Sequence, residues 1–150
     1  MEYLDELFRL STVCGPSGRS DLYFFAKLIA EGKSINVFNN GDMERDFTYI
    51  DDIVQGIRSA LDHNYRCEIF NLGNSKSEQL RDMIRLIEDS VGIRAKLNFM
   101  PKQAGDVRKS IADIAYSKEK LGYEPTTDIG VGIAKFIKWF KENEGVKYGA

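Results

Sequence analysis

The sequence is poor in the residues that most nucleophilic and metal-dependent sites need. Its 150 residues include one histidine, His63, and two cysteines, Cys14 and Cys67. A serine or cysteine nucleophile activated by an imidazole would have to use that one histidine, and a zinc site would need further cysteines or histidines. His63 stands in the polar stretch LDHNYR, which is typical of a solvated turn. We therefore expect no histidine-dependent nucleophile, no metal site and two free thiols.

The chain also lacks an excess of one charge and a long apolar run. It has 21 basic and 23 acidic side chains, for a formal net charge of −2, whereas nucleic-acid-binding domains usually have a basic surplus. No apolar run reaches the roughly 18 residues that a membrane helix needs. The acidic start MEYLDELFRL differs from the basic start of a signal peptide. These features favour a cytoplasmic protein that binds neither nucleic acid nor membranes.

Length and composition favour one globular domain. Hydrophobic residues make up 43% of the chain and charged residues 29%, and a chain of this length can bury a core. Strand-like and helix-like segments alternate, which predicts an α/β fold. The expected strands are 7–13, 35–38, 47–50, 67–73 and 95–101; the expected helices are 20–33, 51–62, one between a Ser75–Glu78 capping box and Gly92, 113–122, and one that starts near Thr127 or Asp128.

No glycine-rich phosphate loop follows any of the expected strands. The chain has neither the G-x-G-x-x-G pattern of dinucleotide-binding folds nor a Walker A sequence. The loop STVCGPSGRSD, residues 11–21, has the glycines and proline of a ligand-binding loop but matches neither pattern. The expected strands are also few and short for a complete doubly wound sheet.

Arg45 is the first candidate binding residue. It stands in NNGDMERDFTYIDD, just before the expected buried strand 47–50. A guanidinium in such a position needs an anionic partner, because an unpaired buried charge is very costly. One possible partner is a neighbouring carboxylate, Asp46, Asp51 or Asp52. The other is the phosphate of a ligand, which arginine binds through two parallel hydrogen bonds.

Three further residues have both a structural and a ligand-binding interpretation. Asp106, in QAGDVRKSIAD, either forms a turn after Gly105 or accepts hydrogen bonds from ligand hydroxyls. Asn36 and Phe38 share one face of the expected strand 35–38, because side chains alternate along a strand. An asparagine is unusual on a core face, so this face is a candidate pocket lining. Phe38 then either stacks on a base or sugar ring or packs in the core.

Together these stretches resemble one enzyme family. The matching segments are, in order, RLSTVCGPSGRSD, INVFNNGDMERDFTYIDDIVQGI, IFNLGNS and QAGDVRKSIAD. They resemble the C-terminal half of extended short-chain dehydrogenase/reductases, and most of all the NAD-dependent sugar-nucleotide epimerases of the UDP-glucuronate 4-epimerase type. The resemblance runs from Phe8 to Phe140. It implies an α/β fold of the NAD(P)-binding Rossmann superfamily, in which residues 1–150 form a single substrate-binding domain and most of the Rossmann domain is absent.

The resemblance implies nucleotide-binding roles for four residues of this chain. Arg45 would hold the diphosphate of UDP, and Asp106 would lie beside the ribose or the diphosphate. Asn36 and Phe38 would flank the uracil ring.

Four residues of the opening loop and its strand would lie farther along the ligand. Thr12 and Arg19 match positions that face the sugar and its carboxylate in the uronate epimerases. An arginine is suited to selecting a sugar that bears a carboxylate. Leu10 and Ser11 would pass near the nicotinamide end of NAD, so they are the expected cofactor-side residues.

The family's catalytic machinery, in contrast, lies N-terminal to the matching region. In the full enzymes a Tyr-x-x-x-Lys tyrosine helps to remove a hydride from C4 of the sugar, and NAD accepts the hydride and returns it to the other face. Two pairs here have that spacing, Tyr23 with Lys27 and Tyr116 with Lys120. Both lie in stretches that align with non-catalytic helices. The resemblance therefore implies no catalytic residue in this chain, no NAD binding by this chain alone and weak binding of a UDP-sugar.

Two functional hypotheses remain open. The chain is either the substrate-binding part of a truncated sugar-nucleotide epimerase or dehydratase, inactive unless an N-terminal NAD-binding partner chain completes it, or a non-catalytic interaction module. In the second case it would form homo-oligomers through the apolar surface that the absent half leaves exposed. Under both hypotheses the expected strand 7–13 is an edge strand without a mate on one side.

Overall fold

The computed structural model describes residues 5–16, 20–63, 65 and 67–144. The elements in chain order are β1 (Asp5–Leu10), β2 (Thr12–Cys14), α1 (Asp21–Ala30), β3 (Ser34–Val37), the short 3₁₀ helix η1 (Phe38–Gly41), β4 (Glu44–Tyr49), α2 (Ile50–His63), β5 (Cys67–Leu72), β6 (Ser77–Gln79), α3 (Leu80–Val91), β7 (Lys96–Phe99), α4 (Ala115–Leu121) and α5 (Ile129–Asn143). The predicted α/β class is confirmed.

The strands in the described part of the chain form three small sheets, and most of the strand pairs are parallel. β1 pairs with β5, β2 pairs with β4, and β3 pairs with β7, all in parallel. Only β6 runs antiparallel to its neighbour, β4. Parallel pairs need long crossover connections, and here α1, α2 and the other helices supply them.

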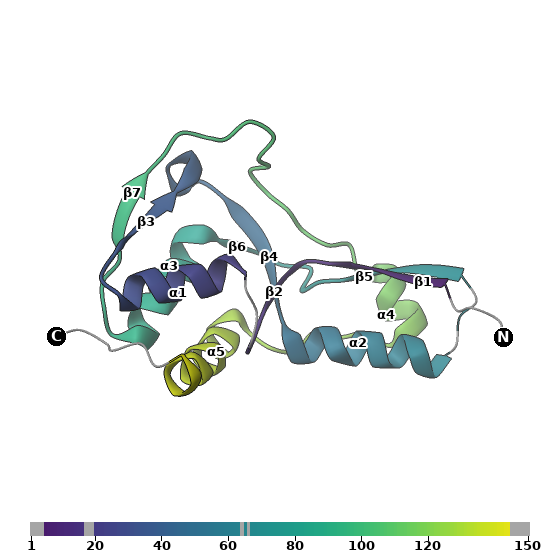
Figure 1. Ribbon diagram of the computed structural model, residues 1–150. Helices are drawn as coiled ribbons and strands as arrows, with labels where there is room; N and C mark the ends of the chain where they lie inside the picture. The colour runs from purple at the N-terminus through teal and green to yellow at the C-terminus, as the bar shows by residue number, and fades with distance from the viewer. Residues whose placement is uncertain (1–4, 17–19, 64, 66, 145–150) are drawn as a thin grey trace.

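The helices divide the buried side chains into two hydrophobic cores. The larger core lies among α1, α3 and α5 and the strands β3 and β4, whereas the smaller core lies between β5 and the helices α2 and α4. Figure 1 shows these two groups at opposite ends of the molecule, with β4 running between them. The long segment that joins β7 to α4 arches over the top of the same view and so connects the two ends.

The predicted strand 7–13 is wrong in one respect, because it is two strands of different sheets. β1 ends at Leu10 and β2 begins at Thr12. Between them, the backbone N–H of Ser11 donates to the carbonyl of Leu72 on β5 at 3.0 Å. The Ser11 hydroxyl lies 2.5 Å from that of Thr48 on β4. The chain therefore exchanges one neighbouring strand for another at Ser11, which a continuous apolar run does not reveal.

The predicted capping box at Ser75–Glu78 is also wrong. Ser77–Gln79 forms β6, and α3 begins at Leu80 without a side-chain cap. The N–H of Leu80 donates to the carbonyl of Met43 at 2.8 Å, and the Ser77 hydroxyl donates to Glu44 at 2.7 Å. Hydrogen bonds to the β4 region thus replace the local cap that the sequence suggested.

Both cysteines are free thiols, as predicted. Cys14 is buried in the larger core, and burial raises the pKa of its thiol to about 11. Cys67 is exposed at the start of β5. His63 is the last residue of α2 rather than a turn residue, and its Nδ1 lies 2.7 Å from the carbonyl oxygen of Ser59.

None of the helices in the described ranges has the length and apolar character that a membrane crossing requires. Within the same ranges, no group of three or more histidine, cysteine, aspartate or glutamate side chains is arranged to hold a metal ion.

Candidate functional site

A cavity of about 350 Å³ brings together most of the predicted binding residues that the structure describes. We call it the inner cavity. Its lining residues come from β2, α1, β3, η1, β4 and the residue before it, α3 and the segment after β7: Thr12, Asp21, Phe25, Asn36, Phe38, Met43, Arg45, Phe47, Leu80, Met83, Gln103 and Asp106. The lining combines aromatic and aliphatic side chains with the charged side chains of Asp21, Arg45 and Asp106, a mixture that suits a ligand with a flat ring and an anionic group.

Arg45 and Asp106, predicted separately, form an ion pair. Arg45 Nη2 donates to Asp106 Oδ1 at 2.8 Å, and the two side chains are 20% and 25% exposed. Arg45 Nη1 donates to the carbonyl oxygens of Glu44, at 2.9 Å, and of Arg108, at 3.4 Å. The guanidinium is therefore fixed in the cavity wall by one carboxylate and two neutral acceptors.

None of the three neighbouring carboxylates that the sequence suggested is the partner of Arg45. Asp46 is buried at 1% exposure and points away from Arg45, because successive side chains of a strand alternate. Asp51 lies 4.0 Å from Lys135, and Asp52 accepts the backbone N–H groups that lead into α5. The true partner is far away in sequence, so no local pattern could indicate it.

Asp46 is a structural residue that fastens three segments together. Its carboxylate accepts hydrogen bonds from the backbone N–H groups of Asn74 at 2.8 Å, Ser75 at 3.0 Å and Ala112 at 3.0 Å. The hydroxyl of Thr48 donates to it as well, at 3.2 Å. These bonds hold the turn after β5 and the segment before α4 against β4. Sequence reasoning missed this role because all three backbone partners are distant in the chain.

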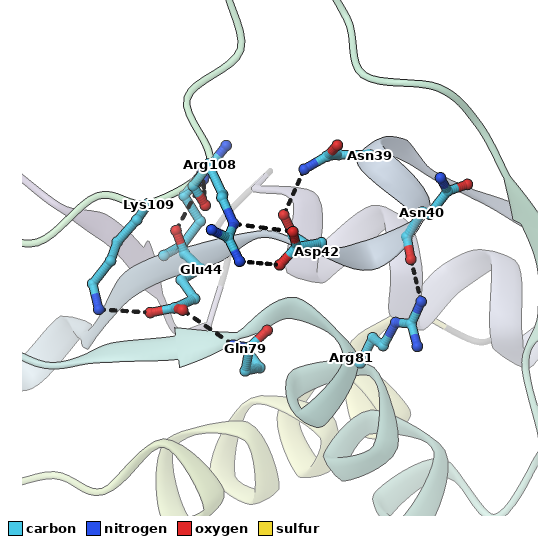
Figure 2. A network of polar contacts seen from close by, with 9 residues as sticks. Asn39, Asn40, Asp42, Glu44, Gln79, Arg81, Arg108 and Lys109 are labelled. Atoms are coloured by element: carbon cyan, nitrogen blue, oxygen red, sulfur yellow. Dashed lines mark hydrogen bonds and ion pairs between the residues drawn. The ribbon is translucent and has the colours of Figure 1, made fainter.

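The segment that carries Asp106 is attached to β4 by further polar contacts. Figure 2 shows Arg108 against Asp42 and Lys109 against Glu44, at 3.0 Å and 2.8 Å. Exposed ion pairs of this kind stabilise little by themselves. Glu44 also exchanges backbone bonds with this segment, receiving at its carbonyl from Ser110 and donating from its N–H to Arg108. Hydrogen bonds first from Lys109 and then from Ser77 lower the pKa of the Glu44 carboxyl.

Asp106 forms the predicted turn, and its role as an acceptor for ligand hydroxyls stays a prediction. Its N–H donates to the carbonyl of Gln103 at 3.2 Å, while its carboxylate accepts from Arg45. The turn therefore aims the side chain into the inner cavity.

Asn36 and Phe38 line the inner cavity as the strand pattern predicted, but they do not lie on the core face of β3. That face holds Ile35 and Val37, and Asn36 is exposed. Asn36 Oδ1 accepts from Asn98 Nδ2 of the neighbouring β7 at 2.9 Å. Phe38 is half-buried where β3 passes into η1.

A second, more open cavity of about 480 Å³ adjoins the first. We call it the outer cavity. Its lining comes from the ends of β1 and β5, from β4 and from the segment before α4: Arg9, Leu10, Ser11, Thr12, Arg45, Asp46, Asn71, Ser110, Ile111, Ala112 and Asp113. Thr12 and Arg45 line both cavities. Leu10 and Ser11, predicted near the cofactor, line the outer one, whereas Arg19 lies outside the described residues.

The two Tyr-x-x-x-Lys pairs are away from both cavities. The hydroxyl of Tyr23 donates to Glu144 at 2.7 Å, and that of Tyr116 donates to Glu68 at 2.8 Å. Lys120 Nζ lies 5.8 Å from the centre of the Tyr116 ring. Neither tyrosine lines a cavity wall. Sequence reasoning missed instead Asp21 and Gln103, which line the inner cavity but stand in no distinctive local pattern.

The α/β fold thus contains two joined cavities with an arginine at their junction. Residues 7–73 match the sequence model of the NAD dependent epimerase/dehydratase family. The chain is 41% identical to UDP-glucuronate 4-epimerase 4 of Arabidopsis thaliana over 152 residues, which covers 88% of this chain and 35% of that protein. It is 49% identical to an uncharacterized protein of Methanocaldococcus jannaschii over 138 residues, which covers 91% and 42%.

Solved structures give the same relationship. UDP-glucuronic acid 4-epimerase from Bacillus cereus, in complex with UDP-glucuronic acid and NAD, superposes with a TM-score of 0.81 and 32% identity over 90% of this chain and 44% of that one. UDP-glucose 4-epimerase from Thermotoga maritima with UDP-glucose gives 0.83 and 28% over 93% and 46%. The chain is thus homologous to the NAD dependent epimerase/dehydratase family and has its α/β fold. It spans less than half the length of these relatives.

Proposed function

We propose that this chain is the substrate-binding part of an NAD-dependent sugar-nucleotide 4-epimerase or dehydratase that acts on a UDP-sugar of the glucuronate type. The observation that supports the proposal is the position of Arg45, which lines both cavities and is held there by Asp106. A nucleoside diphosphate sugar consists of a flat base, a doubly charged centre and a polar ring. We propose that these parts correspond, in that order, to the inner cavity, Arg45 and the outer cavity.

The inner cavity is suited to the nucleoside. Phe38 offers a ring face for stacking, and Asn36, on the exposed face of the same strand, offers donors and acceptors for a base edge. Asp106 can accept a hydrogen bond from a ribose hydroxyl while it remains paired with Arg45, because a carboxylate has several acceptor sites.

Arg45 is suited to the diphosphate. Its Nη1 is bonded only to neutral carbonyl oxygens in this structure. Charged phosphate oxygens make shorter and stronger hydrogen bonds to a guanidinium than neutral carbonyls do. The sugar would then lie in the outer cavity beside Thr12, with Arg19 as the proposed partner of a sugar carboxylate.

The residues of this chain do not fit NAD on their own. Leu10 and Ser11 line the outer cavity, but the sequence has no glycine-rich loop that could receive the cofactor's pyrophosphate. We therefore propose that the chain supplies no catalytic residue, that an N-terminal NAD-binding partner supplies the cofactor site and the catalytic tyrosine, and that this chain alone does not turn over substrate.

Isothermal titration calorimetry of the chain with UDP tests the proposal. We expect weak binding by the unsubstituted chain and at least an approximately tenfold loss with Arg45→Ala, because a charge-assisted hydrogen bond contributes about 1.5–3 kcal/mol. Arg85→Ala is a matched control, since Arg85 lies on the exposed side of α3, where it pairs with Asp82. An absence of UDP binding, or equal binding by the Arg45→Ala variant, would refute the site. Micromolar binding of NAD by this chain alone would contradict the assignment of the cofactor to a partner.

A further inference from the structure

The segment between β7 and α4 contributes to the walls of both cavities, yet its middle part is not packed into a core. It supplies Gln103 and Asp106 to the inner cavity and residues 110–113 to the outer one. Within residues 101–107 every side chain is exposed except that of Asp106, which is half-buried. Hydrophobic packing therefore does not hold this part in place. We call residues 101–107 the tip of the segment.

Backbone hydrogen bonds anchor the segment on both sides of the tip. Before the tip, the N–H of Met100 donates to the carbonyl of Val37 at 2.9 Å, and the carbonyl of Met100 accepts from the N–H of Asn40 at 3.1 Å. After the tip, the carbonyl of Arg108 accepts from the N–H of Glu44 at 2.8 Å. Figure 2 shows the ion pairs beside this second anchor. The tip thus lies between two fixed points.

The tip itself has a single polar contact with the rest of the described chain. This contact is the ion pair of Asp106 with Arg45, at 2.8 Å. The other hydrogen bond of the tip is internal, from the N–H of Asp106 to the carbonyl of Gln103. Gly105 has a φ of 84°, and a Cβ atom there would meet no atom within 4 Å. A partly exposed ion pair stabilises little, so the tip can detach at a low free-energy cost.

We propose that the tip is a lid on the inner cavity, that the Asp106–Arg45 ion pair is its latch, and that a bound nucleoside diphosphate holds it closed. This inference rests on the proposed function and adds the route by which the ligand enters. Gln103 and Asp106 are the lining residues that the tip supplies, so a displaced tip removes both from the cavity wall. The remaining lining residues belong to, or directly adjoin, helices and strands. The tip is therefore the movable side of the cavity.

The nucleoside, rather than the diphosphate, provides the bonds that close the lid. Ribose hydroxyls can donate to the carboxylate of Asp106, and the amide of Gln103 can both donate and accept. These bonds exist only while the lid is closed, so a ligand that makes them shifts the equilibrium towards the closed form. A diphosphate without a nucleoside has only acceptor oxygens for Asp106 to meet, and it competes with Asp106 for Arg45. We therefore expect UDP, and not inorganic pyrophosphate, to close the lid.

Limited trypsin digestion of the full chain tests the proposal, because Lys102 lies in the tip. Cleavage of a transiently opened segment follows the population of its open form, so saturating UDP should slow cleavage after Lys102 by at least about fivefold. Without ligand, Asp106→Asn should speed this cleavage by about threefold, since it removes the charge of a partly exposed ion pair. Mass spectrometry of the fragments measures both rates. Cleavage after Lys109 is the internal reference, because the N–H of Ser110 donates to the carbonyl of Glu44 at 3.2 Å.

Glu124→Gln is the matched control, since Glu124 pairs with Lys118 at 3.3 Å and neither residue lines a cavity. Unchanged cleavage after Lys102 when calorimetry shows that UDP is bound would overturn the lid. Equal cleavage of the ligand-free Asp106→Asn and Glu124→Gln variants would overturn the latch. Equal slowing by UDP and by pyrophosphate would show that the nucleoside does not close the tip. If calorimetry detects no UDP binding, the proposed function fails, while the ligand-free comparison still decides the latch.

Discussion

At the scale of single residues, two neighbouring side chains of β4 have opposite tasks. Arg45 lines both cavities, while the carboxylate of Asp46 accepts backbone hydrogen bonds from Asn74, Ser75 and Ala112. Asp46 lines the outer cavity but its carboxylate oxygens are occupied by these groups. The bond to Ala112 helps to hold the segment that follows Asp106 against β4.

We predict that Asp46→Asn destabilises the fold. The amide that replaces one carboxylate oxygen cannot accept a hydrogen bond, so at least one buried N–H group loses its partner. Such a loss costs about 1–3 kcal/mol. Urea unfolding followed by circular dichroism measures the effect, with Asp62→Asn as the control because the Asp62 side chain is 72% exposed. Equal unfolding midpoints for the two variants would contradict the structural role of Asp46.

At the scale of elements, α2 approaches β5 and the loop after α4 through a glycine. A Cβ atom at Gly56 would lie 2.7 Å from Leu72 Cδ2 and 2.8 Å from Tyr123 Cδ2. The Tyr123 ring cannot readily move, because it is fully buried and its hydroxyl donates to the carbonyl of Gly73 at 3.0 Å. Gly56 therefore sets how closely α2 packs on the smaller core.

We predict that Gly56→Ala lowers the free energy of unfolding by about 1–2 kcal/mol. Overpacking of a filled core costs about 1–3 kcal/mol, and the better helix propensity of alanine offsets up to about 1 kcal/mol. Gln55→Ala serves as the control on the exposed side of the same helix. Chemical denaturation of both variants provides the comparison. A stabilised Gly56→Ala variant would show that α2 has room to shift away from Tyr123.

At the scale of the whole molecule, the two cores differ in size. Three helices cover the larger core, whereas the smaller core depends on α2, α4 and the two-stranded β1–β5 sheet, on which Leu7 and Ile69 are exposed. Regions with fewer buried apolar contacts and exposed backbone hydrogen bonds open at a lower free-energy cost. We therefore expect the end of the molecule that contains β1 and β5 to be the less stable one.

We predict that hydrogen exchange detects this difference. In the free chain, the amides of β1 and β5 should exchange faster than those of β4 and α5. Mass spectrometry of peptic fragments measures the exchange of each element. Equal protection at the two ends of the chain would show that the smaller core is as stable as the larger one.

The sequence by itself determined the α/β class, most helix bounds and the family resemblance. The apolar periodicity of 129–143 and the glycines after 121 and 91 are local signals, and the structure confirms the elements they predict. The sequence also indicated Arg45 and Asp106 as candidate binding residues, because polar residues next to buried strands need partners in any fold.

Only the tertiary structure decided which of these residues meet. Arg45 pairs with a carboxylate 61 positions away rather than with its neighbours. The apolar run 7–13 is divided at Ser11 because two different strands, β4 and β5, offer hydrogen bonds on either side of it. Ser77–Gln79 becomes a strand because β4 pairs with it. Each of these outcomes depends on contacts between distant segments, and local propensity and spacing hold no information about such contacts.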